Sequence, residues 1–558
     1  MNLFIFEIIY FLFFLSSVGY GILFNKLFKI LPNSSNFGFL SLYGLIFLVF
    51  ISYISIFFIS HNIYFNLILH FIGIFIFFEK LIKKKIRIEK IYFLIIFILS
   101  LSLLISKNHD DFPYYHLQQS LNFTFNSIQI GLSNLDLTYA HQSSLLLLNS
   151  LYYIPKFKYF FFNVPNLIFY TSVVLIFYNF SFSRSRFNFH KFFSLLSLIY
   201  ILVKFTRLSE FGTDIIGQCL IILFLSFIIS LIVDNKKQEN SLLNCFVLLT
   251  LCITLKTYFV VYFLFFLYLF WKVGVVKIFK IILQNYLLSI FLLLIMISFF
   301  VINIFNTGCI IYPFPSLCFE SLFWSMPIEE VKSYQIWYEV WAKSLAGAGY
   351  RVEDYLELLN ILDWLPIWIK NYFFTKGLEN ILLIIFLSTI FLMTFRYKQI
   401  TNKYKKTEVV YVFSIIFIIF CIWFFKHPSL RYGGYAPLFL LFAIPVSFYV
   451  SLGSNYKVNI NKSFKILFII SITFFSLKNI FRIQSEFQRN DLYKFNNFPF
   501  FYVSETKYEL IIVSDVAKVY KLKDGDNCWA TPSPCPYTKN IKAKKKFGFI
   551  IFYKDKKK

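Results

Sequence analysis

Apolar stretches long enough to cross a lipid bilayer alternate with short polar links along most of the chain. A membrane-spanning helix needs roughly 17 to 25 mostly apolar residues, because every backbone polar group in lipid must be paired within the segment. By this criterion the pattern predicts about fourteen spans. They lie near residues 3–24, 37–59, 64–79, 91–106, 158–180, 191–207, 213–233, 242–255, 257–271, 281–303, 378–395, 408–425, 435–452 and 465–481.

The composition indicates that lipid, rather than water, is the solvent of this chain. Of 558 residues, 58% are hydrophobic and only 15% are charged, and the mean hydropathy is +0.68. No soluble core of ordinary shape could bury that much apolar surface. The formal charge of +26 does not indicate nucleic acid, since the basic residues occur in short clusters between spans. We therefore predict an all-α polytopic membrane protein, with membrane lipids and no nucleic acid among its partners.

Basic links between the predicted spans all fall on one side. They are residues 80–90, 184–191, 236–237, 272–280, 396–406 and 457–462. Basic links prefer the cytoplasm, which predicts a multi-pass protein of the cell inner (cytoplasmic) membrane. The external side would then hold 107–157, 208–212, 304–377, 426–434 and the tail 482–558. The first apolar segment lacks a basic start and a small-residue cleavage site, so we expect a span there rather than a cleaved signal peptide.

The positions of the cysteines along the chain agree with this predicted orientation. Four of the eight lie in apolar spans, and the other four form two close pairs in predicted external segments, Cys309 with Cys318 and Cys528 with Cys535. Because disulfides persist in oxidising compartments, we expect both pairs to be joined. The alternative for such pairs is a zinc site, but the spacings of nine and seven and the lack of a nearby His favour disulfides.

The densest group of polar residues follows the fourth predicted span and includes His109, Asp110, Asp111 and His116. Adjacent carboxylates and His side chains at the mouth of a helix bundle can bind a metal ion or take a proton from a hydroxyl. A solvated helix end is the alternative interpretation. The half-polar segment behind it, which carries Asn122, Gln129, Asp136, His141 and Asn149, is typical of external amphipathic helices on the membrane surface and favours a site.

Charged residues recur in the other external turns. Arg207 and Asp214 flank one short turn, and Lys204 and Lys256 lie near the ends of spans that reach the same side. Each of these Lys residues could instead be an interface side chain that reaches for water. Arg431, with Tyr432 beside it, stands in a tight turn, where a guanidinium suits a lipid phosphate. An interface anchor is the alternative there.

The segment 304–377 is the largest predicted external loop. It contains five of the eight Trp residues, together with a concentration of Asp and Glu. Trp prefers the headgroup zone of a membrane. We expect short surface helices that cover a cavity, as either a structural lid or a sugar-binding one.

Four sequence motifs on the predicted external side resemble, in their order along the chain, the GT-C superfamily of membrane glycosyltransferases. They are more closely similar to a bacterial branch of it. They are Asp-Asp-Phe-Pro-Tyr-Tyr-His-Leu at 110–117, Thr-Gly-Cys-Ile-Ile-Tyr-Pro at 307–313, Pro-Ser-Leu-Arg-Tyr at 428–432, and the Cys-Trp and Pro-Cys-Pro of the tail at 528–536. The likeness covers about residues 91–540. It implies three additional spans in 1–90, a GT-C-like transmembrane core in 91–481 and a small external tail in 482–558.

The resemblance also implies roles for individual residues. Asp110 or Asp111 would be the general base that activates an acceptor hydroxyl. Arg431 would bind the departing lipid phosphate, with Lys256 beside it, and Asp214 would orient the acceptor or a cation. His109, His116, Arg207 and Tyr432 complete the expected substrate-binding set. Many members of the superfamily need no metal, so the carboxylates do not establish a cofactor, and a divalent cation stays an open alternative.

The expected function is therefore that of a membrane glycosyltransferase. It would move a sugar from a polyprenyl-phosphate-linked donor to a glycan or lipid acceptor of the cell envelope, on the external face. One alternative is a transporter or flippase of a lipid-linked saccharide, which would also need many spans and basic residues. Another is a polysaccharide polymerase or ligase. The donor sugar and the acceptor cannot be read from apolar helices.

Overall fold

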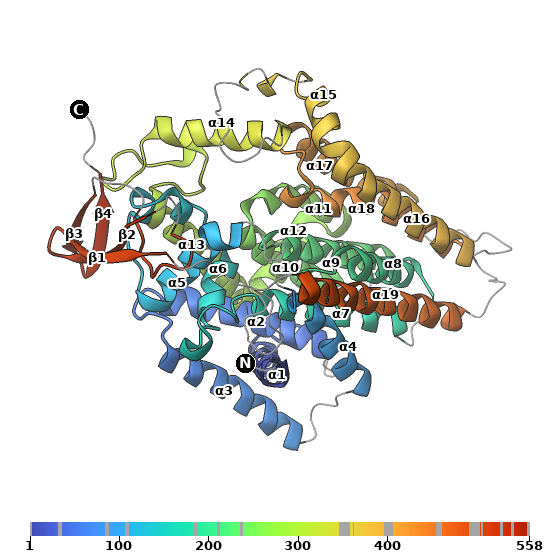
Figure 1. The fold of residues 1–558 in the computed structure, drawn as a ribbon. Coiled ribbons are helices and arrows are strands. Elements are labelled where there is room, and N and C mark those ends of the chain that lie inside the picture. The colour runs from blue at the N-terminus through green and yellow to red at the C-terminus, as the bar shows by residue number, and fades with distance from the viewer. Residues whose placement is uncertain are drawn as a thin grey trace.

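The structure of the chain, a computed structural model, is mostly helical (Figure 1). It describes residues 3–31, 36–83, 89–105, 111–183, 187–208, 212–234, 238–344, 356, 358–360, 362–395, 406–453, 460–489, 503, 506–524, 528–536 and 541–554. The longer helices run side by side, and the strands lie together at the left-hand end of the molecule in Figure 1.

The first half of the chain contains α1 (Leu3–Phe28), α2 (Phe37–Ser55), α3 (Ile63–Ile82), α4 (Lys90–Ser100), α5 (Leu117–Phe125), α6 (Ser144–Ser150), α7 (Val164–Phe182), α8 (Phe189–Lys204), α9 (Asp214–Val233) and α10 (Gln238–Leu255). The second half contains α11 (Phe265–Val273), α12 (Val275–Gln284), α13 (Tyr286–Thr307), α14 (Ile328–Ser344), α15 (Leu365–Trp368), α16 (Leu378–Thr394), α17 (Lys406–Lys426), α18 (Tyr435–Ser451) and α19 (Ile460–Arg489). Four short strands follow, β1 (Tyr508–Val513), β2 (Ala517–Leu522), β3 (Lys542–Lys546) and β4 (Phe549–Tyr553).

The polytopic helical architecture agrees with the prediction, although the count of fourteen spans is not confirmed. Among the described residues, ten helices are long and apolar enough to cross a membrane, or eleven if one bent pair is a single span. That pair, Thr257–Val273 and Val275–Gln284, turns by 104° at Gly274, whose positive φ of 91° favours glycine. Each remaining predicted span falls on a shorter helix, namely α4, α8 or α18.

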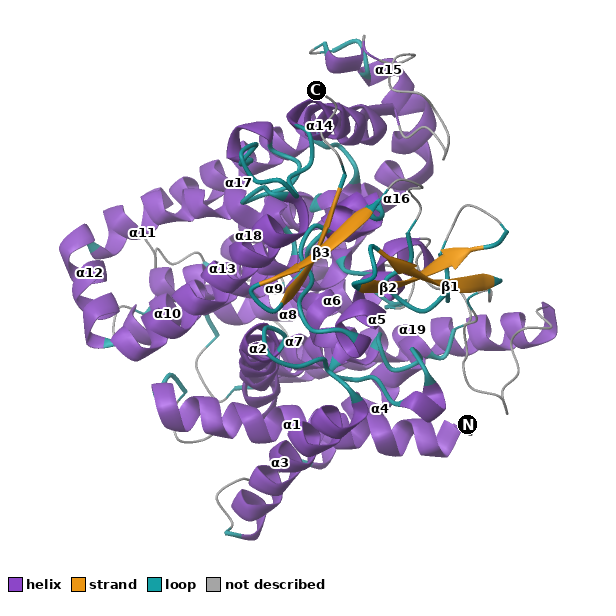
Figure 2. Cartoon of the chain, turned by 90° about the vertical axis from the view of Figure 1, so that its left-hand side faces the viewer, coloured by secondary structure: helices purple, strands orange, loops and turns teal. Residues whose placement is uncertain are grey.

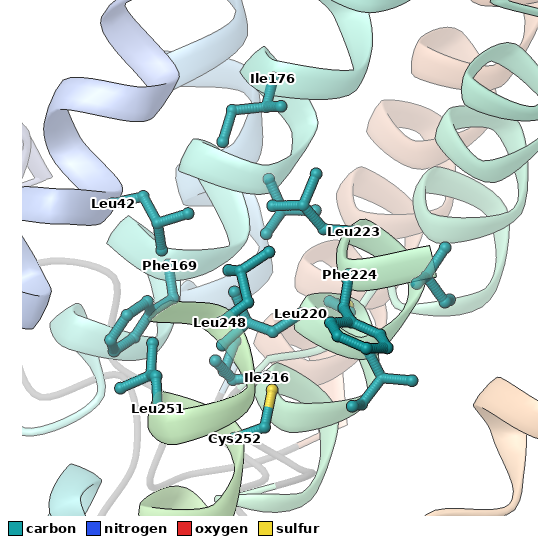
Figure 3. Packing of buried hydrophobic residues seen from close by; sticks show 14 of the residues in the cluster. Leu42, Phe169, Ile176, Ile216, Leu220, Leu223, Phe224, Leu248, Leu251 and Cys252 are labelled. Atoms are coloured by element: carbon teal, nitrogen blue, oxygen red, sulfur yellow. The ribbon is translucent and has the colours of Figure 1, made fainter. Parts of the chain in front are cut away.

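The interior of the bundle is an apolar core with close interhelical contacts. In Figure 3, Leu42 of α2, Phe169 of α7, Leu220 of α9 and Leu251 of α10 point toward one another, and all four are buried. Small residues bring α1 and α2 into backbone contact, since a Cβ at Gly44 would collide with the Ser17 carbonyl. Such packing is a principal source of helix association in lipid, where apolar burial alone drives little.

Contacts between helix ends bring the described flanks of several basic links to one end of the bundle. The rings of Phe182, Phe395 and Phe464, from the ends of α7, α16 and α19, meet at 5.4 to 6.3 Å. Lys272 forms an ion pair of 2.6 Å with Glu408, which joins the link after α11 to the start of α17. The flanks of separate basic links thus share one end, as the charge pattern predicts.

The C-terminal tail folds as two antiparallel hairpins, β1 with β2 and β3 with β4, at the opposite end. Figure 2, viewed from that end, shows the strands in front of the bundle, close to α5 and α6. The Phe552 N–H donates to Ile130 O at 2.8 Å, and Ile130 N–H donates to Ile550 O at 2.9 Å, so the second hairpin is joined to the segment after α5. The predicted disulfides are both present, Cys309–Cys318 and Cys528–Cys535.

The prediction of amphipathic helices on the membrane surface in 107–157 is wrong. Leu117 to Thr124 of α5 and every residue of α6 are buried. Most of their polar side chains form hydrogen bonds with other protein groups. Gln119, for example, donates to the carbonyls of Thr138 and His141 at 2.6 and 2.7 Å. A half-polar segment can be interior when it is covered by other loops and its polar atoms are paired.

We predict that the tail and the basic links lie on opposite sides of a membrane. In a variant that lacks Cys219, Cys245, Cys252 and Cys421, a thiol introduced by Phe547→Cys should react with a membrane-impermeant maleimide added to intact cells. Phe547 is 85% exposed at the tip of the second hairpin. A thiol introduced by Lys462→Cys, at the other end of the bundle, should react only after the cells are opened. Labelling of both positions in intact cells would contradict this topology.

Candidate functional site

Four charged side chains meet at the end of the bundle that carries the tail, and we call Asp111, Asp214, Lys256 and Arg431 the charge cluster. Arg431 pairs through Nη2 with Asp111 Oδ2 and lies 3.3 Å through Nε from Asp214 Oδ2. The other oxygen of Asp214, Oδ1, pairs with Lys256 Nζ. Asp214 is 6% exposed, and the other three side chains are 21 to 27% exposed. Arg431 therefore bridges two carboxylates that are 103 positions apart in the sequence.

Helix ends position three members of the cluster. Asp214 is the first residue of α9, where the positive end of the helix dipole favours a carboxylate. Lys256 follows the last residue of α10, where the negative end favours a cation. Asp111 directly precedes a π-helical turn, Phe112–His116, which continues into α5. Turns of this kind often occur at functional sites because they shift side chains relative to a regular helix.

Hydrogen bonds to its backbone hold the turn of Arg431 from several sides. Trp368 Nε1 donates to Pro428 O at 2.8 Å, and Trp423 Nε1 donates to Ser429 O at 3.0 Å. Leu430 N–H donates to the Tyr372 hydroxyl at 2.8 Å. The turn is thus rigid, which fixes where the guanidinium can reach.

Two glycines allow this turn to be tight. Gly433 has a φ of 106°, in the left-handed region, and a Cβ there would collide with the ring of Tyr258. A Cβ at Gly434 would collide with the Trp423 indole. Any larger residue at either position would displace Arg431.

Aromatic rings enclose the two cations. The Arg431 guanidinium carbon lies 5.5 Å from the ring centre of Trp341 and 5.2 Å from that of Tyr432. Lys256 Nζ lies 4.6 Å from the Tyr432 ring. Trp341 comes from α14, so the segment 304–377 does contribute to the site. Cation–π contacts of this kind stabilise cations that have lost water.

His141, which the sequence analysis named only as one polar residue of the segment 107–157, belongs to the same region. Its ring lies 5.3 Å from that of Tyr115, and its Nε2 is 2.6 Å from the Tyr338 hydroxyl. Burial lowers the pKa of His141 to about 4, although the charge of Asp111 raises it. Its ring is therefore neutral at pH 7 and can accept a proton in a hydrogen bond. Tyr338 had no signal in the sequence, because it is one of 38 Tyr residues.

The structure brings together only part of the predicted set of site residues. Asp111, Asp214, Lys256, Arg431 and Tyr432 converge, as described above. His116 is buried, with its ring 4.2 Å from that of Tyr115. Arg207 follows the end of α8 beside Thr206, to which Arg482 of α19 donates a hydrogen bond of 2.7 Å. His109 and Asp110 lie outside the described residues.

The described part of the chain shows no evident binding site for a metal ion. No group of three or more His, Cys, Asp or Glu side chains is arranged there to hold one. The carboxylates of the charge cluster are instead bonded to Arg431 and Lys256. What the arrangement offers is acid–base chemistry at a carboxylate and recognition of an anion by two cations.

The C-terminal tail supports the element that carries Asp111. Gln118, in the first turn of α5, donates to the carbonyls of Trp529 and Thr531 at 2.8 and 2.7 Å. Tyr139 accepts a hydrogen bond of 3.1 Å from Cys535 N–H, inside the loop that the Cys528–Cys535 disulfide closes. The tail motif, the Asp111 motif and the Arg431 motif therefore lie at the same end of the molecule.

We predict that the ion pairs are necessary for stability. Asp214→Asn leaves Lys256 without its nearest carboxylate in a largely buried position, which should cost about 3 kcal/mol. The midpoint of thermal unfolding in detergent should fall. The double change Asp214→Asn with Lys256→Gln should recover part of that loss, because no unpaired charge remains. Asp515→Asn, in the exposed turn between β1 and β2, is the matched control and should change little. An unchanged midpoint for Asp214→Asn would contradict a buried pair.

Comparison with known proteins identifies the family. No curated protein and no solved structure matches the chain significantly. A family model described as a domain of unknown function, DUF8201, matches residues 1–438, a range that includes α1 to α3 and all four residues of the charge cluster. Since that match covers most of the chain, the protein belongs to the DUF8201 family.

Proposed function

We propose that this protein is a membrane glycosyltransferase of the GT-C type, which transfers a sugar from a polyprenyl-phosphate-linked donor to a cell-envelope acceptor. The single observation that carries the proposal is the charge cluster, in which a rigidly held Arg431 contacts Asp111 and Asp214 beside Lys256. A carboxylate and a phosphate-binding guanidinium at one point are what such a transfer requires. The motifs that resemble the superfamily supply these two groups.

In the proposed reaction Asp111 acts as the general base. Its carboxylate takes the proton of an acceptor hydroxyl as that oxygen attacks the anomeric carbon of the donor sugar. The bond between the anomeric carbon and the phosphate oxygen breaks, and its electron pair leaves with the phosphate. Arg431 and Lys256 neutralise the charge that develops on this leaving group. The acceptor proton ends on Asp111 and the sugar ends on the acceptor oxygen.

Without a donor, the cluster holds its base in an inactive pairing. A carboxylate paired with a guanidinium is a weak base, because the cation favours its ionised form. A lipid phosphate competes with Asp111 for Arg431, since phosphate and carboxylate both match the planar guanidinium. Donor binding would therefore release Asp111 as it engages Arg431. In this order the donor binds first and Asp111 deprotonates the acceptor second. An acceptor hydroxyl is then not deprotonated while the donor sugar is absent.

The orientation of the protein follows from the same proposal. The charge cluster lies at the end of the bundle away from the basic links, so a cytoplasmic location for the links would place the transfer on the external face of the cell inner membrane. Trp341 and the other aromatic side chains around Arg431 would keep water from the phosphate. A polymerase or ligase would use the same chemistry with a larger acceptor.

We predict that the general base and the phosphate-binding residue can be separated by mutation. Asp111→Asn keeps the shape but removes the proton acceptor, and should lower the rate of transfer from a lipid-linked donor in proteoliposomes about 100-fold or more. The same change should tighten the binding of polyprenyl phosphate, because a competitor for Arg431 is lost. Arg431→Lys keeps the charge but loses the planar fork, and should weaken donor binding.

The matched control for these variants is Asp136→Asn. Asp136 caps the helical turn Leu137–Ala140 through the Thr138 N–H at 2.9 Å, and an Asn side chain can do the same. Transfer should be unchanged there. Asp110→Asn tests the neighbouring carboxylate separately. If neither Asp110→Asn nor Asp111→Asn slows transfer, neither carboxylate is the general base and the proposed site is wrong. If the intact lipid-linked saccharide is moved without cleavage, the protein is a carrier and the proposal fails.

A further inference from the structure

Helix α12 differs from the spans beside it in both direction and length. It turns by 104° from the helical segment Thr257–Val273 that precedes it. Its ten residues, Val275–Gln284, extend about 15 Å, which is half the roughly 30 Å thickness of the hydrocarbon core of a bilayer. Figure 2 shows α12 at the edge of the molecule, beside α11. A helix of this length, nearly at a right angle to a span, can lie along a membrane surface but cannot cross the membrane.

Hydrogen bonds fix α12 at the end of the bundle that carries the basic links. Lys277 Nζ donates to Gln238 Oε1 at 2.7 Å, and Asn285 Nδ2, directly after α12, donates to Glu239 Oε1 at 3.1 Å. Gln238 and Glu239 begin α10, next to the basic link 236–237. The ion pair between the link after α11 and the start of α17 lies at the same end. The helix therefore connects two spans on one side of the membrane.

One face of α12 is apolar and exposed, although the helix has a separate buried face. Ile278 and Ile281 are buried in the protein. Three other apolar side chains, spaced three and four residues apart, are 84, 57 and 72% exposed, namely Val276, Phe279 and Leu283. An open hollow of about 560 Å³ lies against this face and is lined mainly by apolar atoms. An exposed apolar patch of this kind marks a surface that another molecule or an apolar solvent covers.

Basic side chains border the apolar face. Lys280 and Gln284 line the same hollow, and Lys277 lies one turn before Lys280. Both Lys side chains are exposed, and α12 contains no Asp or Glu. An apolar face with a basic flank is typical of a helix at a membrane surface. Its apolar side chains enter the boundary between headgroups and acyl chains, and its Lys side chains reach anionic headgroups.

Aromatic side chains at both ends of α12 indicate its depth. Trp271, before the bend, is 55% exposed, and its ring lies 5.4 Å from that of Tyr411, with the two planes 1° apart. Tyr286, the first residue of α13, is 57% exposed. Trp and Tyr collect where lipid meets water. Because such residues flank α12 on both sides, the whole helix is expected at that boundary.

We propose that α12 is an in-plane helix that binds anionic phospholipid in the membrane leaflet on the side of the basic links. Val276, Phe279 and Leu283 enter the leaflet below the phosphates, and Lys277 and Lys280 contact the headgroups. The cytoplasmic leaflet carries a negative surface potential, which matches the charge of this helix. The inference does not depend on sugar transfer, because α12 lies at the end of the bundle away from the charge cluster.

The depth of introduced labels distinguishes an in-plane helix from a span. The full chain without its four free Cys residues receives one Cys at a time, is spin-labelled, and is placed in liposomes of phosphatidylcholine with phosphatidylglycerol. Labels at Val276→Cys, Phe279→Cys and Leu283→Cys should share one shallow depth, given by the ratio of their accessibility to oxygen and to a water-soluble nickel chelate. On α13, Ile297→Cys should give a much deeper label than Ile290→Cys, because that helix crosses the membrane.

A second measurement identifies the headgroup. A fluorophore at Phe279→Cys should be quenched more by nitroxide-labelled phosphatidylglycerol than by nitroxide-labelled phosphatidylcholine. Lys277→Gln with Lys280→Gln should lower the relative affinity for phosphatidylglycerol about 25-fold, since each basic residue near a membrane surface is worth roughly fivefold. The corresponding double change to Arg keeps both charges and should retain the preference. Lys462→Gln with Lys465→Gln, at exposed positions of α19 on the same side, is the matched control and should leave the preference unchanged.

Several results would overturn the proposal. Labels along α12 that differ in depth as those along α13 do would show that α12 enters the bilayer. Labels that the nickel chelate reaches more readily than oxygen does would place the apolar face in water. Labels shielded from both reagents would show that protein, such as a second copy of the chain, covers this face. Equal quenching by the two lipids, or an equal loss of preference in the α19 control, would contradict a site for anionic lipid on α12.

Discussion

The pairing of opposite charges at the mouth of an apolar bundle is the constraint on which the site depends. Arg431 and Lys256 are mostly removed from water, and an isolated charge in such a place is costly. Asp111 and Asp214 offset that cost, because their two negative charges balance the two positive charges. The ion pairs of Arg431 also join elements far apart in the sequence, because Asp111 and Arg431 are separated by 320 residues. The pairs thus join the ends of helices that lipid contacts alone would leave free to shift.

The same pairing gives the cluster its chemical character. A balanced set of charges is stable without a ligand, yet it contains groups that a phosphate can engage in exchange for a carboxylate. The rigid turn around Arg431 matters here, because a guanidinium fixed by its backbone loses little freedom when it exchanges partners. His141, neutral at pH 7 because burial lowers its pKa to about 4, adds a hydrogen-bonding group that does not disturb this balance.

The segments that connect the helices at the end with the charge cluster and the C-terminal tail together support this end of the molecule. Two backbone carbonyls of the tail accept hydrogen bonds from Gln118, in the helix that continues from Asp111. Helix α14 supplies Trp341, whose ring centre lies 5.5 Å from the guanidinium carbon of Arg431. Segments that a hydropathy profile would assign to separate loops are therefore one packed layer. This explains why α5 and α6 are buried rather than spread on a membrane surface.

The sequence by itself determined the polytopic helical class, the grouping of the basic links at one end and the two disulfide pairs. Apolar length, charge and Cys spacing are local properties, and they persist in any arrangement of the helices. The sequence also pointed to Asp111, Asp214, Lys256 and Arg431 as members of one external face. It overestimated the number of long spans, because a 104° bend and several short helices do not show in composition.

Only the tertiary structure decided which of these charges meet. Arg207 and Arg431 both follow predicted spans in short turns, yet Arg431 contacts Asp111 and Asp214 whereas Arg207 lies beside Thr206, to which Arg482 of α19 donates a hydrogen bond. The hairpins of the tail and the contact of His141 with Tyr338 likewise had no signal in the pattern of residues. Helix ends come together through crossing angles and close backbone contacts, which depend on packing over the whole bundle. Hydropathy and charge reveal which end of a helix a residue occupies, but not its neighbours there.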